Sequence, residues 1–261
     1  MKKVSFKPEM KWKKIHSKHS PQARQGHTAV MSGDTMFVYG GERASYAYSD
    51  VWSFDVTEEE WNFVPSTTVA PEARYEHSAV MHGGVMYIYG GRNPMPMGDC
   101  HKFDPADSSW SEITVDEGLT PRFGHTAAVI DDAMYVFGGY AANGLTNEML
   151  MYSFSKSKWI KLGPRSDNFA TCFNKHPADA IIFTTAIPMG RLGHGMVAVN
   201  GHIVVYGGLG GEDMLEEFSD TWVFDPREKT WKTGNYLAEE ALYDFAYTYV
   251  QSIGSMVLYG G

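Results

Sequence analysis

The sequence predicts an all-β fold assembled from repeats of about fifty residues. Five strand-like stretches of aromatic and β-branched residues each end in a pair of glycines, and successive pairs lie 50, 48, 69 and 53 residues apart. A tryptophan opens another such stretch 20 to 24 residues after each of the first four pairs. A fixed period in this range is typical of repeat architectures. The pairs are Gly40 and Gly41, Gly90 and Gly91, Gly138 and Gly139, Gly207 and Gly208, and Gly260 and Gly261.

The composition indicates one domain with a sizeable core. Hydrophobic residues make up 43% of the chain, and the repeats favour a single domain over residues 1–261 rather than two ordinary ones. With 31 acidic and 22 basic residues the net charge is −9, which argues against general binding of nucleic acid or anionic membranes. No stretch approaches eighteen consecutive apolar residues, so we expect no membrane insertion.

The number of cysteines and the composition of residues 1–15 indicate the cellular compartment of the protein. Cys100 and Cys172 are the two cysteines, so no disulfide framework is implied and a reducing compartment is indicated. Residues 1–15 carry charges throughout and lack the apolar centre of a secretory signal. We expect a cytoplasmic protein, although the sequence does not distinguish the cytoplasm from the nucleus.

The first repeat carries the signals of four short strands in order. Residues 26–31 form a strand of small residues, and a polar turn leads to residues 35–39, which end at the first glycine pair. After a variable loop, residues 50–55 form the third strand and residues 61–64 the fourth. Turn residues bound aromatic and β-branched runs at each step, which is the expected pattern of antiparallel hairpins.

The same order of strands recurs along the chain. An insertion of about twenty residues lengthens the spacing between the third and fourth repeats, and it falls within residues 163–190. A loop of this length in a compact domain is usually functional or disordered, and we favour disorder. The predicted units cover about residues 24–64, 74–113, 122–162, 191–233, and 243–261 together with 10–15.

The last unit combines the two ends of the sequence. Trp12 resembles the tryptophans that open fourth strands, but no glycine pair precedes it. We therefore expect residues 10–15 to supply the fourth strand of a fifth, incomplete unit that ends at Gly261. Because this unit lacks a third strand, the natural chain is expected to continue past Gly261.

These residues together resemble the kelch repeat. An arginine is followed three residues later by a histidine, the histidine precedes the first glycine of the pair by 13 residues, and a tryptophan follows. The resemblance implies a β-propeller in which each unit is a four-stranded blade. In the fifth unit, the same count places Asp244 and Tyr247 where arginine and histidine are expected. The matching residues are Arg24, His27 and Trp61; Arg74, His77 and Trp110; Arg122, His125 and Trp159; and Arg191, His194 and Trp231.

Two alternatives concern these repeated residues. The four histidines would form a metal ring if the inner strands placed them round the axis, since imidazole suits zinc, copper or iron. The other interpretation is that each histidine packs within the repeat, and we favour it. The arginines are either anion clamps or structural groups bonded to carbonyls and acidic neighbours, and we favour the structural role.

Enzyme relatives of the kelch family provide a further alternative. The resemblance to a galactose-oxidase-like enzyme implies a copper site with a cysteine-modified tyrosine, and neither cysteine lies in such a pattern. Plant specifier proteins carry an iron site with Glu, Asp and His at intervals of four, but Glu112 and Asp116 are followed by Thr120. We therefore expect no catalytic residue, no cofactor and no metal.

The variable loops provide the predicted binding site. In kelch propellers such loops emerge on one face, and loops on a rigid scaffold often carry function. We expect a partner protein or peptide to bind there, with a basic and aromatic side and an acidic side that together fit a peptide carrying charges of both signs. A structural scaffold for assembly is the remaining alternative. The candidate residues are Glu42, Arg43, Tyr46, Tyr48, Arg92, Asn93, Met95, Met97, Tyr140, Asn143, Glu212, Asp213, Glu216 and Glu217.

Overall fold

A computed structural model describes residues 13–115, 119–162, 187–211, 213–234, 240–252 and 254–261. Every regular element in these ranges is a β-strand. The described residues include no helix of the length and apolarity that crossing a bilayer requires. The predicted all-β class is confirmed. The inserted segment 163–190 lies outside these ranges except for its last four residues.

Most strands belong to four antiparallel sheets of four strands, which we call blades 1 to 4. In each blade the strands are adjacent in chain order, apart from the short hairpins described below. The blades contain β1 (Thr28–Ser32), β2 (Thr35–Tyr39), β5 (Val51–Asp55) and β6 (Glu60–Val64); β7 (Ser78–His82), β8 (Val85–Tyr89), β9 (Cys100–Asp104) and β10 (Ser109–Ile113); β12 (Thr126–Ile130), β13 (Ala133–Phe137), β16 (Met149–Ser153) and β17 (Lys158–Lys161); and β19 (Gly195–Val199), β20 (His202–Tyr206), β23 (Thr221–Asp225) and β24 (Thr230–Thr233).

The last two strands form a sheet of their own, the terminal hairpin. It pairs β25 (Ala246–Val250) with β26 (Ser255–Tyr259), and Ala246 lies opposite Tyr259. In blade 1 the corresponding pair is Thr28 and Tyr39. Four residues separate the strands of the terminal hairpin, whereas two separate β1 from β2.

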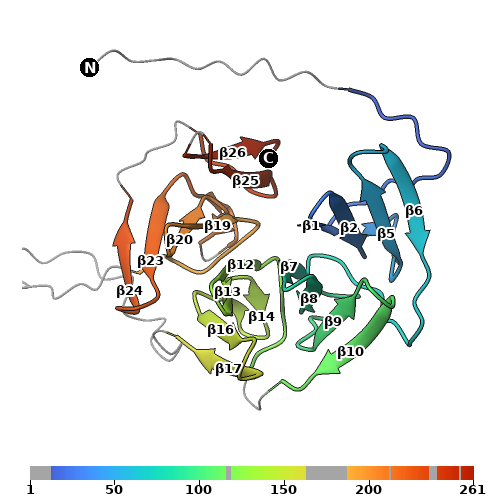
Figure 1. Ribbon diagram of the computed structural model, residues 1–261. Helices are drawn as coiled ribbons and strands as arrows, with labels where there is room; N and C mark the ends of the chain where they lie inside the picture. The colour runs from blue at the N-terminus through green and yellow to red at the C-terminus, as the bar shows by residue number, and fades with distance from the viewer. Residues whose placement is uncertain (1–12, 116–118, 163–186, 212, 235–239, 253) are drawn as a thin grey trace, which may run out of the picture.

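The sheets stand side by side round an axis, with β1, β7, β12, β19 and β25 innermost (Figure 1). Aromatic side chains fill the space between neighbouring sheets, as the large apolar area of such residues favours. Between blades 1 and 2, for example, Phe37 and Tyr39 pack in one cluster with Met86, Phe103 and Trp110. Equivalent clusters lie between blades 2 and 3 and between blades 3 and 4.

The two ends of this arc are the terminal hairpin and blade 1 (Figure 1). Their inner strands are more exposed than those between them: Ala29 and Met31 of β1, and Ala246 and Thr248 of β25, face solvent. In β7, β12 and β19 the first residue of the strand is buried. Contact with a neighbour on both sides therefore covers the inner strands only in blades 2 to 4.

The structure does not support the predicted N-terminal strand. Residues 13–15 form no strand, and the sheet that β25 and β26 form in the described structure has two strands. Lys13 instead pairs with Glu59 at 2.5 Å, and the hydroxyl of Ser17 accepts a hydrogen bond of 3.0 Å from the backbone N–H of Trp61. These contacts hold the segment against the rim of blade 1 and away from the terminal hairpin. Trp12 lies outside the described residues.

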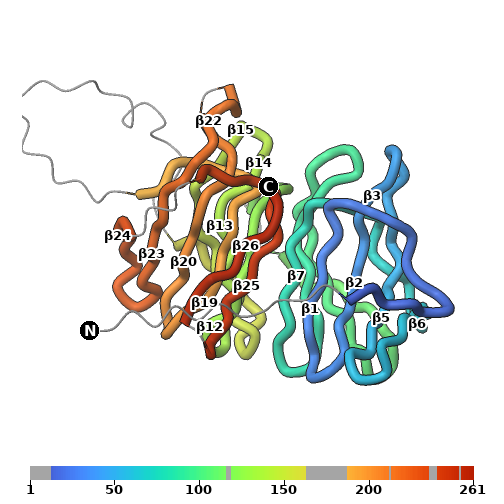
Figure 2. The backbone as a smooth tube through the Cα atoms, turned by 90° about the horizontal axis from the view of Figure 1, so that it is seen from above, coloured from blue at the N-terminus to red at the C-terminus, as the bar shows by residue number. Residues whose placement is uncertain are grey.

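Short hairpins extend from the blades where the variable loops were predicted. Figure 2 shows β3, β14, β15 and β22 at one end of the molecule, which we call the loop face. Two further short strands, β11 and β18, precede blades 3 and 4 and join the hairpins there. The bounds are β3 (Glu42–Arg43), β4 (Tyr46–Ala47), β11 (Arg122–Phe123), β14 (Tyr140–Ala141), β15 (Gly144–Leu145), β18 (Arg191–Leu192), β21 (Leu209–Gly210) and β22 (Glu216–Glu217).

Candidate binding face

The repeated arginines fix the base of each hairpin on the loop face. Arg74 donates to the carbonyl oxygens of Glu72 and Gly90 at 3.0 Å each and to both carboxylate oxygens of Asp99 at 2.7 Å. Its side chain is fully buried. A forked guanidinium matches this arrangement of two carbonyls and a carboxylate. Arg24 and Arg191 bond in the same way to Asp50 and Asp220, and Arg122 donates to one carboxylate oxygen of Glu148.

The repeated histidines join one blade to the preceding one. The Nε2 atom of His77 lies 2.8 Å from the hydroxyl of Thr28, and Nε2 of His125 lies 2.9 Å from that of Ser78. Burial and the nearby Arg122 charge lower the pKa of His125 to about 3. Its Nδ1 atom has no hydrogen-bond partner in the described structure, so a second ring proton would be unsatisfied. His27, which has no described blade before it, is exposed.

The fifth unit is aligned differently from our prediction. The carbonyl of Leu242 accepts a 2.8 Å bond from the N–H of Gly208, just as the carbonyl of Arg74 accepts one from Gly41. Leu242 therefore stands at the arginine position, and Phe245 at the histidine position. The prediction that Asp244 and Tyr247 stand there was wrong. The turn of the terminal hairpin is two residues longer than that of blade 1, so counting back from Gly260 with the spacing of the other units reaches residues two positions too far along the chain.

A chain of backbone hydrogen bonds follows the arc of units round the axis at the loop face, from blade 1 to the fifth unit. Each bond runs from the N–H of one unit to the carbonyl at the same position of the unit before, over 2.7, 2.9, 3.0 and 2.9 Å. All five residues of the chain have positive φ, which favours glycine. Two of them carry carboxylates instead, so negative charge is placed near the axis. The residues in order are Gly26, Glu76, Gly124, Gly193 and Asp244.

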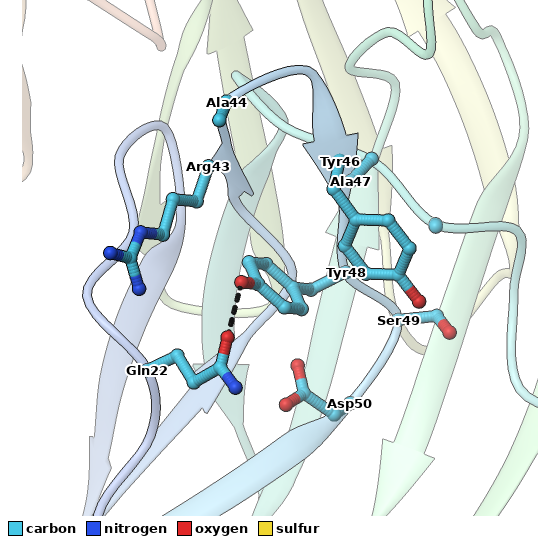
Figure 3. Close-up of a pocket in the computed structure, with 9 residues that line it drawn as sticks. Gln22, Arg43, Ala44, Tyr46, Ala47, Tyr48, Ser49 and Asp50 are labelled. Carbon is cyan, nitrogen blue, oxygen red and sulfur yellow. Dashed lines mark hydrogen bonds between the residues drawn. The ribbon is translucent and has the colours of Figure 1, made fainter.

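A pocket of about 670 Å³ opens on the loop face of blade 1 (Figure 3). The residues of its turn, Ala44 and Ser45, both have positive φ, as the type I′ turn of a two-residue hairpin requires, and Arg43 pairs directly with Tyr46 across it. The tyrosine rings of residues 46 and 48 meet edge to face, with centroids 5.2 Å apart. The lining residues are Gln22, Arg43, Ala44, Tyr46, Ala47, Tyr48, Ser49, Asp50 and Ala73.

The floor of this pocket is held in place by its own contacts. The Tyr48 hydroxyl donates to the side-chain oxygen of Gln22 at 2.9 Å, and the Arg24 guanidinium lies 4.1 Å from the centre of the Tyr48 ring. Burial opposes the ionisation of Asp50, but hydrogen bonds from Arg24 and the Trp52 indole outweigh it and lower the pKa of the carboxyl. Asp50 is therefore ionised and already paired.

Arg92 occupies a different environment from Arg43. Its guanidinium lies over the Tyr75 and Phe123 rings, 4.9 and 4.3 Å from their centres, and donates to Glu76 at 2.7 Å. Burial raises the pKa of Glu76, and the charge of Asp244 raises it further, whereas Arg92 lowers it. Arg92 therefore already neutralises the Glu76 carboxylate beside the axis. Of the two arginines on the predicted basic side of the loop face, Arg43 is the one whose charge remains for a partner.

Comparison with known proteins gives the family. The chain matches the KLHDC2/KLHL20/DRC7 Kelch-repeats domain over residues 4–121 and 114–261. The chain belongs to the kelch-repeat family. It is 29% identical to Kelch domain-containing protein 3 of Bos taurus over 230 residues, which cover 81% of this chain and 54% of that protein, and the human protein of the same name gives the same identity and coverage. It is 26% identical over 159 residues to Leucine-zipper-like transcriptional regulator 1 of Mus musculus, covering 57% of this chain and 19% of that protein. The kelch chain thus spans about half the length of the Kelch domain-containing proteins it matches.

The remaining predicted binding residues of this kelch chain are spread over the loop face. Tyr140 stacks beside Phe123, with ring centroids 5.4 Å apart, and Met95 and Asn143 are exposed. Asn93 and Met97 are partly buried, and Glu42 is engaged by Gln25 and by the backbone of Ser45. On the far side of the face, Asp213, Glu216 and Glu217 are exposed, and Glu212 lies outside the described residues. The blade 1 pocket therefore gathers only Arg43, Tyr46 and Tyr48 of the predicted set.

The described residues contain no group of three or more His, Cys, Asp or Glu side chains that could hold a metal ion. His77, His125 and His194 direct Nε2 to hydroxyl groups of the preceding blade, which favours a role in joining blades over a metal ring.

Ala44, Ala47 and Ser49 lie within the predicted variable loop 42–49, but sequence reasoning missed Gln22, Asp50 and Ala73 as pocket residues. One signal was available for Asp50: an acidic residue also directly precedes the third strand of the other blades, at Asp99, Glu148 and Asp220. Gln22 and Ala73 carried no such signal. They reach the pocket because the segments entering blades 1 and 2 pass beside the β3 and β4 hairpin, and only the packing of neighbouring blades determines this.

Proposed function

We propose that this chain is a non-catalytic platform that binds a partner protein or peptide through the hairpin loops of its loop face. Kelch repeats generally mediate partner binding, and the matched family supports this class of function. The blade 1 pocket is the observation that carries the proposal. An exposed arginine and an exposed tyrosine flank a pocket whose floor is fixed by hydrogen bonds, and these residue types are enriched at binding hot spots.

The two sides of the loop face differ in charge. Arg43 lies on the β3 hairpin, and Asp213, Glu216 and Glu217 lie on and beside the hairpin that contains β22 (Figure 2). A partner segment that crosses the face would meet positive charge at one side and negative charge at the other. Electrostatic complementarity of this kind fixes the register and orientation of a partner more than its affinity.

An affinity capture from lysate of the source organism tests this function. We expect the wild type to retain a partner that the Arg43→Glu/Tyr46→Ala double variant loses. Arg227→Glu is the matched control, because Arg227 is also exposed but lies in the turn before β24 and not on the loop face. If every captured protein is retained equally by the wild type and the double variant, the loop face of blade 1 is not the binding site.

The proposed location is the cytoplasm or the nucleus. The acidic composition and the low cysteine count support this proposal. Fractionation of cells expressing the tagged protein tests it, and recovery in a secreted or membrane fraction would contradict it.

A further inference from the structure

The blade 1 pocket contains a positive charge without a partner among the described residues. The structure describes seven arginines, and five of them form ion pairs: Arg24, Arg74, Arg92, Arg122 and Arg191. Arg43 and Arg227 form none with a described residue. Glu42 precedes Arg43 in the chain, but its two carboxylate oxygens accept hydrogen bonds from Gln25 at 2.6 Å and from Ser45 at 3.1 Å. Successive residues of a strand point to opposite faces, so Glu42 does not neutralise Arg43.

The acidic residue inside the pocket does not neutralise Arg43 either. Asp50 accepts two hydrogen bonds from Arg24, at 2.5 and 3.0 Å, and one of 2.8 Å from the Trp52 indole. These three bonds occupy both carboxylate oxygens. The Arg24 and Asp50 charges therefore cancel, and Arg43 is left as the uncompensated charge of the pocket.

The other polar groups of the pocket also favour an anion. The Gln22 side-chain oxygen accepts the Tyr48 hydroxyl, which leaves the Gln22 amide N–H groups for a ligand. Figure 3 shows Arg43 and Gln22 on one side of Tyr48 and the Tyr46 ring on the other. Tyr46 is 68% exposed, so a ligand that covers its ring removes apolar area from water.

From these contacts we infer that the pocket takes an acidic segment of the partner. An aspartate or glutamate carboxylate binds the Arg43 guanidinium and the Gln22 amide, and a neighbouring side chain of the segment covers Tyr46. This inference rests on the proposed function and adds the chemistry of the partner. The pocket volume of about 670 Å³ lies within the range usual for ligand sites.

Display of random peptides tests the inference without knowledge of the partner. Peptides are joined to the display protein at their C-terminal ends, so that carboxylates come only from side chains, and are selected on the wild type. We expect the selected peptides to share an Asp or Glu at one position. Changing that residue to Asn or Gln, or using Arg43→Gln, should weaken binding about thirtyfold, which is the lower end of the scale for a hot-spot residue.

Two variants serve as controls for these affinities. Arg227→Gln removes the other unpaired arginine and should leave the affinity unchanged, and Arg43→Lys should recover part of the loss because it restores the charge. Arg43 is exposed, so Arg43→Gln should unfold at the same temperature as the wild type. Selected peptides without a shared acidic residue, or unchanged binding by the amide-substituted peptides, would overturn the inference.

The outcomes separate this inference from the proposed function. Peptides that lack acidic residues but lose binding on Tyr46→Ala overturn the acidic segment and leave the loop face as a binding site. Failure to select any peptide, or binding that neither Arg43→Gln nor Tyr46→Ala changes, overturns both. A second library with free C-termini completes the test: if its binders carry only the terminal carboxylate, the side-chain assignment is wrong.

Discussion

The Nε2 atom of His194 lies 2.6 Å from the hydroxyl oxygen of Thr126, the residue that opens the inner strand of the preceding blade. Both residues are buried. We expect Thr126→Val to destabilise the protein by about 1–3 kcal/mol, because it keeps the shape of the side chain but leaves the imidazole without a partner. Urea unfolding measures the change. Thr126→Ser retains the hydroxyl, as Ser78 does in blade 2, and should cost much less; equal losses for the two variants would contradict the role of the hydrogen bond.

The buried histidines also predict a dependence of stability on pH. Burial, followed by the charges of Arg74 and Arg191, holds the pKa of His77 and of His194 well below the ordinary value of 6.5, and the pKa of His125 is about 3. Below pH 6.5 the unfolded chain therefore binds protons that the folded chain does not. The stabilisation is fully present above pH 6.5 and is lost progressively as the pH falls toward the folded pKa.

Urea unfolding at pH 7 and pH 5.5 checks this dependence, and we expect a lower free energy of unfolding at pH 5.5. The paired Asp99 does not contribute in this interval, because its pKa is lowered from 3.8 and its stabilisation is lost only at more acidic pH. Equal stability at the two pH values would contradict the expectation.

Replacing Arg74 with lysine should destabilise the protein, although the substitution keeps the positive charge. Lysine cannot reach two carbonyl groups and both oxygens of Asp99 at once, so Arg74→Lys leaves buried groups without partners. We expect a loss of about 1–3 kcal/mol for each buried carbonyl group left without a donor, measured in urea unfolding. The exposed Arg227→Lys should change the free energy of unfolding by less than about 0.5 kcal/mol. A similarly small effect at Arg74 would show that the fork is not required.

The cost of adding a methyl group to a glycine with positive φ depends on the space around it. A Cβ at Gly138 would lie 2.7 Å from the Arg191 carbonyl oxygen and 2.9 Å from Cε1 of His194, and φ is +71°. Gly33 has a similar φ of +59° but nothing within 4 Å. We expect Gly33→Ala to cost about 1–2 kcal/mol from backbone strain alone and Gly138→Ala distinctly more, measured by thermal unfolding. Equal costs would mean that the close approach of blade 4 is unimportant.

Replacing Asp244 with glycine should stabilise the protein. It has a φ of +53°, burial raises the pKa of its carboxyl, and its charge raises the pKa of Glu76. Asp244→Gly should therefore stabilise the protein by about 0.5–1 kcal/mol in urea and lower the pKa of Glu76 in an NMR titration. Asp244→Asn removes the charge and retains the strain, so it should lower the pKa of Glu76 with a smaller gain in stability. A loss of stability in Asp244→Gly would show that the carboxylate has a partner the backbone geometry does not reveal.

The loop face was harder to predict than the fold. Arg43, Tyr46 and Tyr48 were identified from residue type and from their place after a glycine pair, and they line one pocket. Arg92 has the same residue type but follows its glycine pair directly, at the position that Glu42 has in the first repeat, and its guanidinium lies over two rings and pairs with Glu76. The two arginines differ because Tyr75 and Phe123 come from different repeats, and the sequence carries no record of which side chains meet across an interface.

By itself, the sequence determined the all-β class, the order of strands in each repeat and the family, because hairpin signals and the repeated Arg, His, Gly and Trp are local patterns. Only the tertiary structure decided the alignment of the fifth unit, where a longer turn moves Phe245 to the histidine position, and the contacts of the N-terminal segment with Glu59 and Trp61. It also decided that Arg43, unlike Arg92, forms no ion pair with a described residue. Each of these outcomes depends on packing between units far apart in the chain, and periodicity along one chain cannot specify it.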